Sequence, residues 1–346
     1  MTGLQQILML VLLVSSICGC CIIDGDAKKF VKDVAQAENQ LVTDTGRYLA
    51  TGGYNTYEIE YDAMNDTYSK IPLFPTTLYC YGIVQVNDYI YVMSKANASD
   101  MFLWASPLGT KASDIHFQPI LDLAAWNFTL PNGMALDAQN GYLYLANSGF
   151  THPASGSILQ VILSTPLTVK SVQFVLRNTG HPNGLKVFDG TIYWTSLNQL
   201  WSKTVGDPTA PSILLFERDA SFLDEITIDM DGDGDGDEDA EEEEEEEEKV
   251  VVDQGGRDNK SLLLWTVDYI RGTLLQLSII AGSSSASILV ESRLDTCAGP
   301  SSMLFGRGLA FVANSTVLIS EKGILDDFHS SIGNSLSQVG TTDCHH

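Results

Sequence analysis

The sequence predicts an all-β protein folded as a six-bladed β-propeller. The prediction depends on a repeated hairpin unit, the regular spacing of its copies, and the lack of convincing amphipathic helices longer than about three turns between them. The clearest copies run from Leu130 to Asn147 and from His181 to Thr195. Each reads Pro-Asn-Gly, an alternating strand, a two-residue turn and a second alternating strand. The turns are Asn140-Gly141 and Asp189-Gly190, whose residues accept the positive φ of a tight hairpin.

Six such hairpin units follow one another along the chain. Their paired strands are 38–42 with 47–51, 81–86 with 89–92, the two copies that begin at Asn132 and Asn183, 224–229 with 262–267, and 301–305 with 309–312. The first strands begin 43, 51, 51, 41 and 77 residues apart. Removing an insertion at 230–261 shortens the last interval to 45 residues, and four-stranded propeller blades take roughly 40 to 50. A β-sandwich or two small all-β domains are the alternatives.

The insertion at 230–261 carries most of the acidic charge. The formal net charge is −25, and fifteen of the twenty residues from Asp229 to Glu248 are acidic, which leaves −10 for the rest. We expect this tract to form a disordered surface loop, because it is self-repelling and poor in apolar residues. Its match to an EF-hand Ca²⁺ loop, starting at Asp231, lacks flanking amphipathic helices. The mildly acidic remainder disfavours nucleic acid as a partner, since that needs a basic patch.

Residues 1–20 are predicted to be a signal peptide. The apolar run Ile7–Val14 is too short to span a bilayer, and small residues follow it. The segment Ile17–Cys20 also resembles a bacterial lipoprotein cleavage box. We expect a secreted glycoprotein with no transmembrane span in the mature chain. A disulfide from Cys20 or Cys21 to Cys344 would join the chain ends, although sequence does not fix connectivity. Five Asn-x-Ser/Thr sequons support secretion, at Asn65, Asn97, Asn127, Asn259 and Asn314.

The residues that begin the six first strands are the candidate site. In a propeller the innermost strand of each blade lines a central channel, so these residues gather near one mouth. They are Glu38, Tyr81, Asn132, Asn183, Asp224 and Ser301 or Ser302. Four of them carry a carboxylate or amide oxygen, which are the ligands that Ca²⁺ takes. Taken singly, an Asn before Gly is also typical of a turn, and His152, His181 and Tyr81 are expected in loops or packing.

The ordered set of Asn132–Asp137, Asn183–Leu185, the first-blade Glu38 and the fifth-blade Asp224 resembles the gluconolactonase/regucalcin (senescence marker protein) family, with its paraoxonase and strictosidine-synthase-like relatives. The resemblance spans about residues 34 to 320. It implies a six-bladed propeller over 34–346 that holds a divalent metal, commonly Ca²⁺, in the channel. By position, the metal ligands would be Glu38, Asn132, Asn183 and Asp224.

The activity that the resemblance implies is hydrolysis of a small-molecule lactone or ester. In this reaction the metal polarises the carbonyl, and Asp224 orients or deprotonates water. The chain departs from the family at Asn39-Gln40, Leu130 and Tyr81, where relatives carry Gly-Pro, Arg and His, so a polar sugar lactone is less favoured. Two alternatives stay open: a non-catalytic propeller that binds a protein or glycan, and an extracellular Ca²⁺-binding protein acting through the acidic tract.

Overall fold

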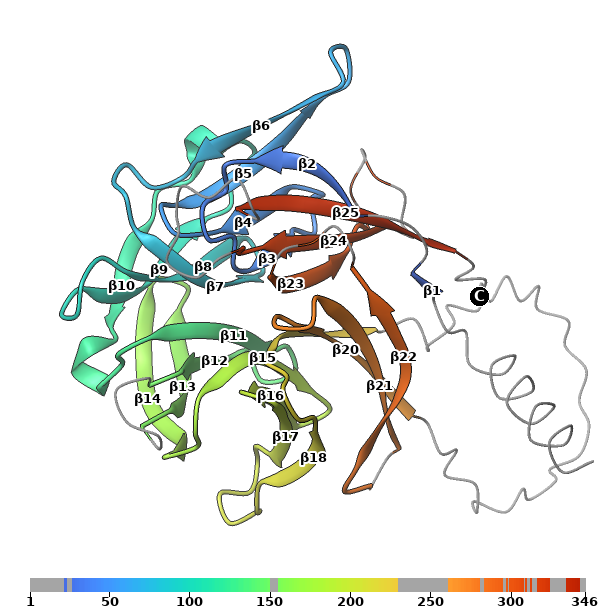
Figure 1. Cartoon of the computed structure of the whole chain (residues 1–346). Helices are drawn as coiled ribbons and strands as arrows, with labels where there is room; N and C mark the ends of the chain where they lie inside the picture. The colour runs from blue at the N-terminus through green and yellow to red at the C-terminus, as the bar shows by residue number, and fades with distance from the viewer. Residues whose placement is uncertain are drawn as a thin grey trace, which may run out of the picture.

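The computed structural model is a six-bladed β-propeller, as the sequence predicts (Figure 1). It describes residues 22–23, 27–149, 155–229, 261–280, 283–294, 297, 299–307, 309, 312, 316–323 and 334–342. In these ranges the strands form six small antiparallel sheets around one centre, which excludes the sandwich alternative. The helical structure that the described residues contain is two single-turn 3-10 helices, η1 (Ala112–Asp114) and η2 (Ala124–Trp126).

Five blades are four-stranded meanders built from consecutive strands, with the first strand of each blade innermost. The first three comprise β3 (Gln40–Val42), β4 (Tyr48–Thr51), β5 (Thr56–Asp62) and β6 (Thr67–Pro72); β7 (Tyr79–Val86), β8 (Tyr89–Lys95), β9 (Met101–Pro107) and β10 (Gln118–Asp122); and β11 (Pro131–Asp137), β12 (Tyr142–Asn147), β13 (Ser157–Thr165) and β14 (Thr168–Arg177). The fourth and fifth comprise β15 (Pro182–Phe188), β16 (Thr191–Ser196), β17 (Gln199–Thr204) and β18 (Ile213–Glu217); and β19 (Leu223–Asp229), β20 (Ser261–Asp268), β21 (Thr273–Ile280) and β22 (Ala286–Arg293).

The sixth blade joins the two ends of the described chain. It contains β23 (Pro300–Phe305), β24 (Thr316–Glu321) and β25 (Ser335–Thr342), and β25 also pairs antiparallel with β1 (Ile22–Ile23) and β2 (Lys28–Lys32). Figure 1 shows β2, in blue, beside β25, in red. The sixth sheet thus takes strands from before residue 34, where the sequence analysis begins the propeller. Buried Glu321 ties the closure together, because Lys29 of β2 pairs with it and Ser337 of β25 donates a hydrogen bond to it.

One predicted strand is wrong. The sequence analysis pairs 301–305 with 309–312, but β23 pairs with β24, at 316–321. The run at 309–312 has strand-like apolar composition, yet Leu309 lies outside any strand and is buried against the core between the sixth and first blades. The peptide N–H of Gly306 bonds to the carbonyl of Thr316, and residues 306–315 separate the two strands, so a tight turn does not join them.

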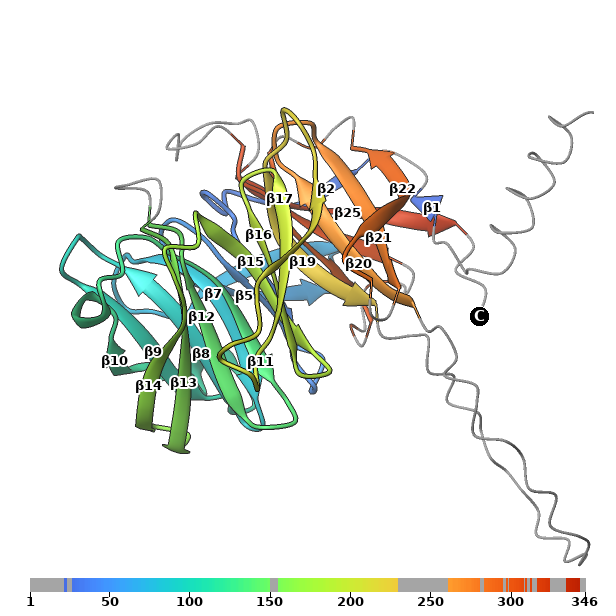
Figure 2. The ribbon, with the colours of Figure 1, turned by 90° about the horizontal axis from the view of Figure 1, so that it is seen from below.

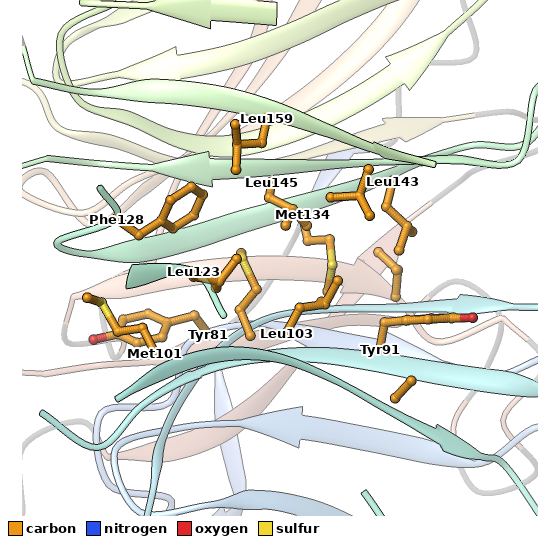
Figure 3. Close-up of a cluster of buried hydrophobic side chains, with 14 residues drawn as sticks. Tyr81, Tyr91, Met101, Leu103, Leu123, Phe128, Met134, Leu143, Leu145 and Leu159 are labelled. Atoms are coloured by element: carbon orange, nitrogen blue, oxygen red, sulfur yellow. The ribbon is translucent and has the colours of Figure 1, made fainter. Parts of the chain in front are cut away.

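The hydrophobic core lies mainly between adjacent blades. Figure 3 shows the contact of the second and third blades, where Met134 of β11 lies among Tyr91 and Leu103 on one side and Leu143 and Leu145 on the other. Equivalent clusters join the other pairs of adjacent blades. Figure 2 shows the ribbon of the blades turned by 90°. The predicted hairpin turns have the expected backbone, with φ of 68° at Gly141 and 67° at Gly190.

Several sequence predictions lie outside the described residues. These are the signal peptide at 1–20, nearly all of the acidic insertion at 230–261 (Ser261 begins β20), His152, the sequons at Asn259 and Asn314, and the bridge from Cys20 or Cys21 to Cys344. Of the described residues, Cys80 and Cys297 are free thiols, and Asn65, Asn97 and Asn127 are exposed. No helix in the described part of the chain has the length and apolar character needed to cross a bilayer.

Candidate functional site

Three of the four residues predicted to form the site, Asn132, Asn183 and Asp224, lie in β-bulges at the start of innermost strands, and Glu38 lies just before β3. In β11 the ladder passes from Pro131↔Asn147 directly to Met134↔Leu145, so Asn132 and Gly133 fall out of register. The same break occurs at Asn183-Gly184 in β15 and at Asp224-Glu225 in β19. A bulge re-aims the side chains it carries. Asn132 and Asn183 are therefore bulge residues inside strands, and the interpretation of them as turn residues is wrong.

The glycine that follows each Asn permits a close approach between blades. A Cβ on Gly133 would lie 2.1 Å from the carbonyl oxygen of Asn183, and a Cβ on Gly184 would lie 2.4 Å from the carbonyl oxygen of Asp224. Real Cβ atoms do not come this near to backbone oxygens, so both positions require glycine. In each Asn-Gly pair the asparagine therefore supplies a polar side chain, and the glycine allows the bulge of the next blade to pack directly against its backbone.

Side-chain hydroxyls hold the bulges in place across blade boundaries. Thr195 of β16 accepts a hydrogen bond from the Gly184 N–H and donates one to the carbonyl of Asp224 in the fifth blade. Ser148, just after β12, donates to the carbonyl of Pro182 over 2.7 Å. Ser301 closes the ring by donating to the carbonyl of Ala37, next to Glu38. These bonds satisfy buried backbone groups at or next to the predicted site residues.

All four predicted site residues are buried, with exposed fractions of 2% for Glu38, 6% for Asn132, 4% for Asn183 and 3% for Asp224. The polar side chain of Asn183 is close enough to Asp224 to lower the pKa of its carboxyl. The Asn132 amide donates to Ser148 Oγ over 2.9 Å, and Ser148 in turn bonds next to Asn183, at Pro182. The structure therefore brings Asn132, Asn183 and Asp224 into one connected group.

Lys322 is the site residue that the sequence analysis does not identify. It follows β24 directly, and its ammonium forms an ion pair with Oε2 of Glu38. Its charge also acts on Asp224, so it interacts with residues of both neighbouring blades, the first and the fifth. Lys322 is 8% exposed. Residues that end the second strands of other blades, such as Ser148 and Thr195, also contact the bulges. The signal for Lys322 was therefore its place after the second strand of the sixth blade, which the wrong strand assignment hid.

Burial and mutual charge set the pKa values at the site. Burial raises the pKa of Asp224 well above its usual range, Lys322 opposes this shift, and Glu38 and Glu225 add to it. Burial would lower the pKa of Lys322, but the carboxylates of Glu38 and Asp224 outweigh it and raise that pKa. Burial likewise raises the pKa of Tyr81, which also senses Glu38 and Lys322 and stacks on Tyr79 with ring centroids 4.6 Å apart. Tyr81 thus belongs to the site as well as to the core.

The donor atoms fit a hard divalent cation. Two buried oxygens of the predicted ligands accept no hydrogen bond from the described residues, Asn132 Oδ1 and Asp224 Oδ2, whereas Glu38 Oε2 pairs with the ammonium of Lys322. A buried polar atom without a partner is costly, and carboxylate and amide oxygens are the ligands that Ca²⁺ prefers. No three His, Cys, Asp or Glu side chains in the described ranges cluster closely enough to hold a metal ion. A cation here would therefore depend on Asn132 and Asn183 as well as on the carboxylates.

A cavity of about 300 Å³ lies in the channel beside these residues. Its walls include Asn39 and Glu225, which directly follow Glu38 and Asp224, and Gln40, Lys186 and Ser302 add polar groups. The carboxylate of Glu225 lies 4.0 Å from the ammonium of Lys186. His181 is not part of these walls, and its ring Nδ1 lies 2.7 Å from the carbonyl oxygen of Ser148. The cavity is at the lower end of the range for small-molecule pockets, roughly 300–1,000 Å³.

Comparisons with known proteins place the chain among six-bladed propellers. No family model matches the sequence, and no curated protein matches it. An auxiliary nutrient binding protein from Bacteroides thetaiotaomicron is similar at a TM-score of 0.56 and 8% identity, over 92% of this chain and 72% of that one. The PQQ-bound aldose sugar dehydrogenase from Streptomyces coelicolor has a TM-score of 0.50 and 10% identity, over 93% and 100%. A putative 6-phosphogluconolactonase from Bacteroides uniformis has 0.49 and 11%, over 80% and 76%.

These propeller neighbours include lactonase-like and sugar dehydrogenase enzymes as well as a nutrient-binding protein. At such low identities the likeness shows the fold alone. Propellers host many unrelated functions, so the chemistry of this chain has to be argued from its own channel residues.

Proposed function

We propose that this protein is a secreted hydrolase of small lactones or esters that works with a divalent cation, most simply Ca²⁺. Glu38, Asn132, Asn183 and Asp224 would hold the cation. The observation that carries the proposal is that buried Asn132 Oδ1 and Asp224 Oδ2 accept no hydrogen bond from the described residues. Glu38 Oε2, from a third blade, is buried with them and has the ammonium of Lys322 as its partner. Oxygens of this kind, from residues far apart in sequence, are what a hard cation requires.

A divalent cation bound here would supply the positive charge that polarises a substrate carbonyl. The chain's own residues would do the rest. Asp224 Oδ2 has no hydrogen-bond partner among the described residues, so it can orient an attacking water and accept its proton. Thr195 fixes the backbone of Asp224 by a hydrogen bond, and the Asn183 side chain lowers the pKa of the Asp224 carboxyl. The channel cavity, about 300 Å³ in volume, suits a small substrate whose apolar part contacts Ile83, Met134 and Phe188.

Secretion is part of the proposal. The apolar run near the N-terminus supports a signal peptide. The sequons at Asn65, Asn97 and Asn127 are exposed, as glycosylation requires. Treatment of the secreted protein with a glycosidase should lower its mass. A mass that does not change would count against secretion with glycosylation at these sequons.

The hydrolase proposal is tested by turnover of a panel of small lactones and aryl esters, with and without a chelator. We expect chelation to abolish hydrolysis and added Ca²⁺ to restore it, and Asp224→Asn to lose at least about 10²-fold in kcat. Asp268→Asn is the matched control, because Asp268 is a buried carboxylate of the same blade whose Oδ1 acceptor the variant keeps. Turnover that changes neither with the chelator nor in the Asp224→Asn variant would contradict the proposal.

A second candidate is a non-catalytic propeller that binds a small molecule, protein or glycan. Lys322 favours it, because an ammonium already neutralises Glu38 within the ring. If this protein binds no divalent ion and hydrolyses none of the lactones and esters tested, that result would support this candidate over the hydrolase.

A further inference from the structure

The position of Lys322 is fixed by the fold. Its backbone N–H bonds to the carbonyl of Gly299 over 2.9 Å, and its carbonyl accepts a hydrogen bond from the Gln36 side chain over 3.2 Å. Gln36 is itself buried and lies two residues before Glu38. Ring closure therefore places Lys322 and Glu38 together from opposite ends of the chain, and the ion pair is built into the joint between the sixth and first blades.

The ammonium of Lys322 contacts the same oxygen that a bound cation would need. Its partner is Glu38 Oε2, the buried carboxylate oxygen that the first blade contributes to the proposed ion ligands. Its charge also acts on the carboxylate of Asp224. A divalent ion among these oxygens would lie next to an ammonium of the same sign, and in a buried site such repulsion is only weakly screened. The ion and the ammonium therefore compete for Glu38.

We propose that Lys322 is a tethered cation that fills the divalent-ion site when the ion is absent and must leave Glu38 before the ion binds. Lys322 thereby sets the affinity of the site. The inference relies on the proposed function only for the identity of the ion ligands. It makes Lys322 a specificity-determining residue, because a bound ion has to replace an ion pair that the fold already supplies.

The test is Tb³⁺ binding, followed through emission excited by tyrosine. Tyr81, which stacks on Tyr79, is close enough to Glu38 to sense its charge, whereas residues 229–260, which include the acidic tract, contain no Tyr or Trp. The readout thus reports the channel site in the full-length protein, without any turnover. Wild type is compared with Lys322→Gln, Lys322→Met and the charge-retaining Lys322→Arg. Lys203→Gln is the control, because Lys203 is also buried and donates to the carbonyl of Ala210 in the fourth blade, outside the site.

We expect Lys322→Gln and Lys322→Met to bind Tb³⁺ at least about tenfold more tightly than wild type, because like-charge repulsion is removed. Lys322→Arg and Lys203→Gln should stay near the wild-type value. If the neutral variants fold poorly, the rise in Tm on adding Ca²⁺ gives the second measurement, and it should be larger for them than for wild type.

The outcomes separate this inference from the proposed function. Equal affinity in wild type and Lys322→Gln would overturn the inference and leave the hydrolase proposal standing. Binding by Lys322→Gln alone would support the inference, since the lysine then excludes the ion, and would contradict the hydrolase proposal. Absence of binding in every protein would overturn both.

Discussion

The hydroxyl of Thr195 donates a hydrogen bond to the backbone carbonyl of Asp224, so a strand of the fourth blade holds the bulge of the fifth. The hydroxyl oxygen of Thr195 also accepts a hydrogen bond from the N–H of Gly184 over 2.8 Å. Thr195→Val keeps the shape but leaves two buried backbone groups without partners, at an expected cost of about 1–3 kcal/mol in the free energy of unfolding. Thr195→Ser keeps the hydroxyl and should lose less. Urea unfolding measures both variants, and equal stability of valine and serine would contradict this role.

The glycines of the Asn-Gly pairs should differ from those of the hairpin turns. Gly133→Ala places a Cβ 2.1 Å from the carbonyl oxygen of Asn183, so we expect a loss of about 3 kcal/mol or more, or failure to fold. At Gly141 nothing lies within 4 Å of the added Cβ, although φ is +68°. Gly141→Ala should therefore cost only about 1–2 kcal/mol of backbone strain. Thermal unfolding of the two variants compares them directly, and a milder effect at Gly133 would show that the inner strands can separate.

Cys80 should be unreactive in the folded protein. It is fully buried, and burial raises the pKa of its thiol to about 12. The reactive thiolate is therefore scarce at neutral pH. Iodoacetamide should modify Cys80 after unfolding and not before, as peptide mass spectrometry would show. Rapid labelling of the native protein would contradict the burial.

The raised pKa of the Cys80 thiol makes the free energy of unfolding depend on pH. The raised pKa keeps the Cys80 thiol neutral in the folded state, whereas the thiol of the unfolded chain ionises in its usual range, at about pH 9. The stability contributed by the neutral thiol is fully present below that pH and is lost as the pH rises toward about 12. Replacement by Ala should make the fall in unfolding free energy above about pH 9 less steep. An unchanged slope would contradict this contribution.

Ring closure by β2 should be required for stability. Val31 is 5% exposed and packs in a core cluster with Tyr48, Leu318 and Leu336, which joins the sixth and first blades. Val31→Asp buries an unpaired carboxylate there, so we expect a loss of about 3 kcal/mol or more. Lys32→Asp, on the exposed face of the same strand, should change stability little. Limited proteolysis after Val31→Asp should cut between these blades first, and resistance equal to wild type would contradict the closure.

The blade repeat could be predicted because its signals are local. Alternating strands and two-residue turns such as Asn140-Gly141 and Asp189-Gly190 are read from short windows. The predicted site residues followed from the same pattern. Asp224 lies at the start of an apolar strand, where a charged side chain indicates a functional role.

The missed features depend on contacts distant in sequence. The closing strand at 28–32 finds its partner some 300 residues later, in β25. A bulge adds a residue that the period-two pattern conceals, and the need for Gly133 comes from a neighbouring blade. Lys322 was hidden because the run at 309–312 is as strand-like in composition as 316–321, and only sheet register distinguishes them.

The central claim is that Glu38, Asn132, Asn183 and Asp224 form one cation site at the channel. It is tested most directly by equilibrium dialysis of the full-length protein against Ca²⁺, comparing wild type with Asp224→Ala, Asn183→Ala and the control Asp268→Asn. The account predicts that the two site variants each lose one bound ion per chain relative to wild type, while the control keeps it. Identical binding in all four proteins would place every bound ion elsewhere and contradict the account.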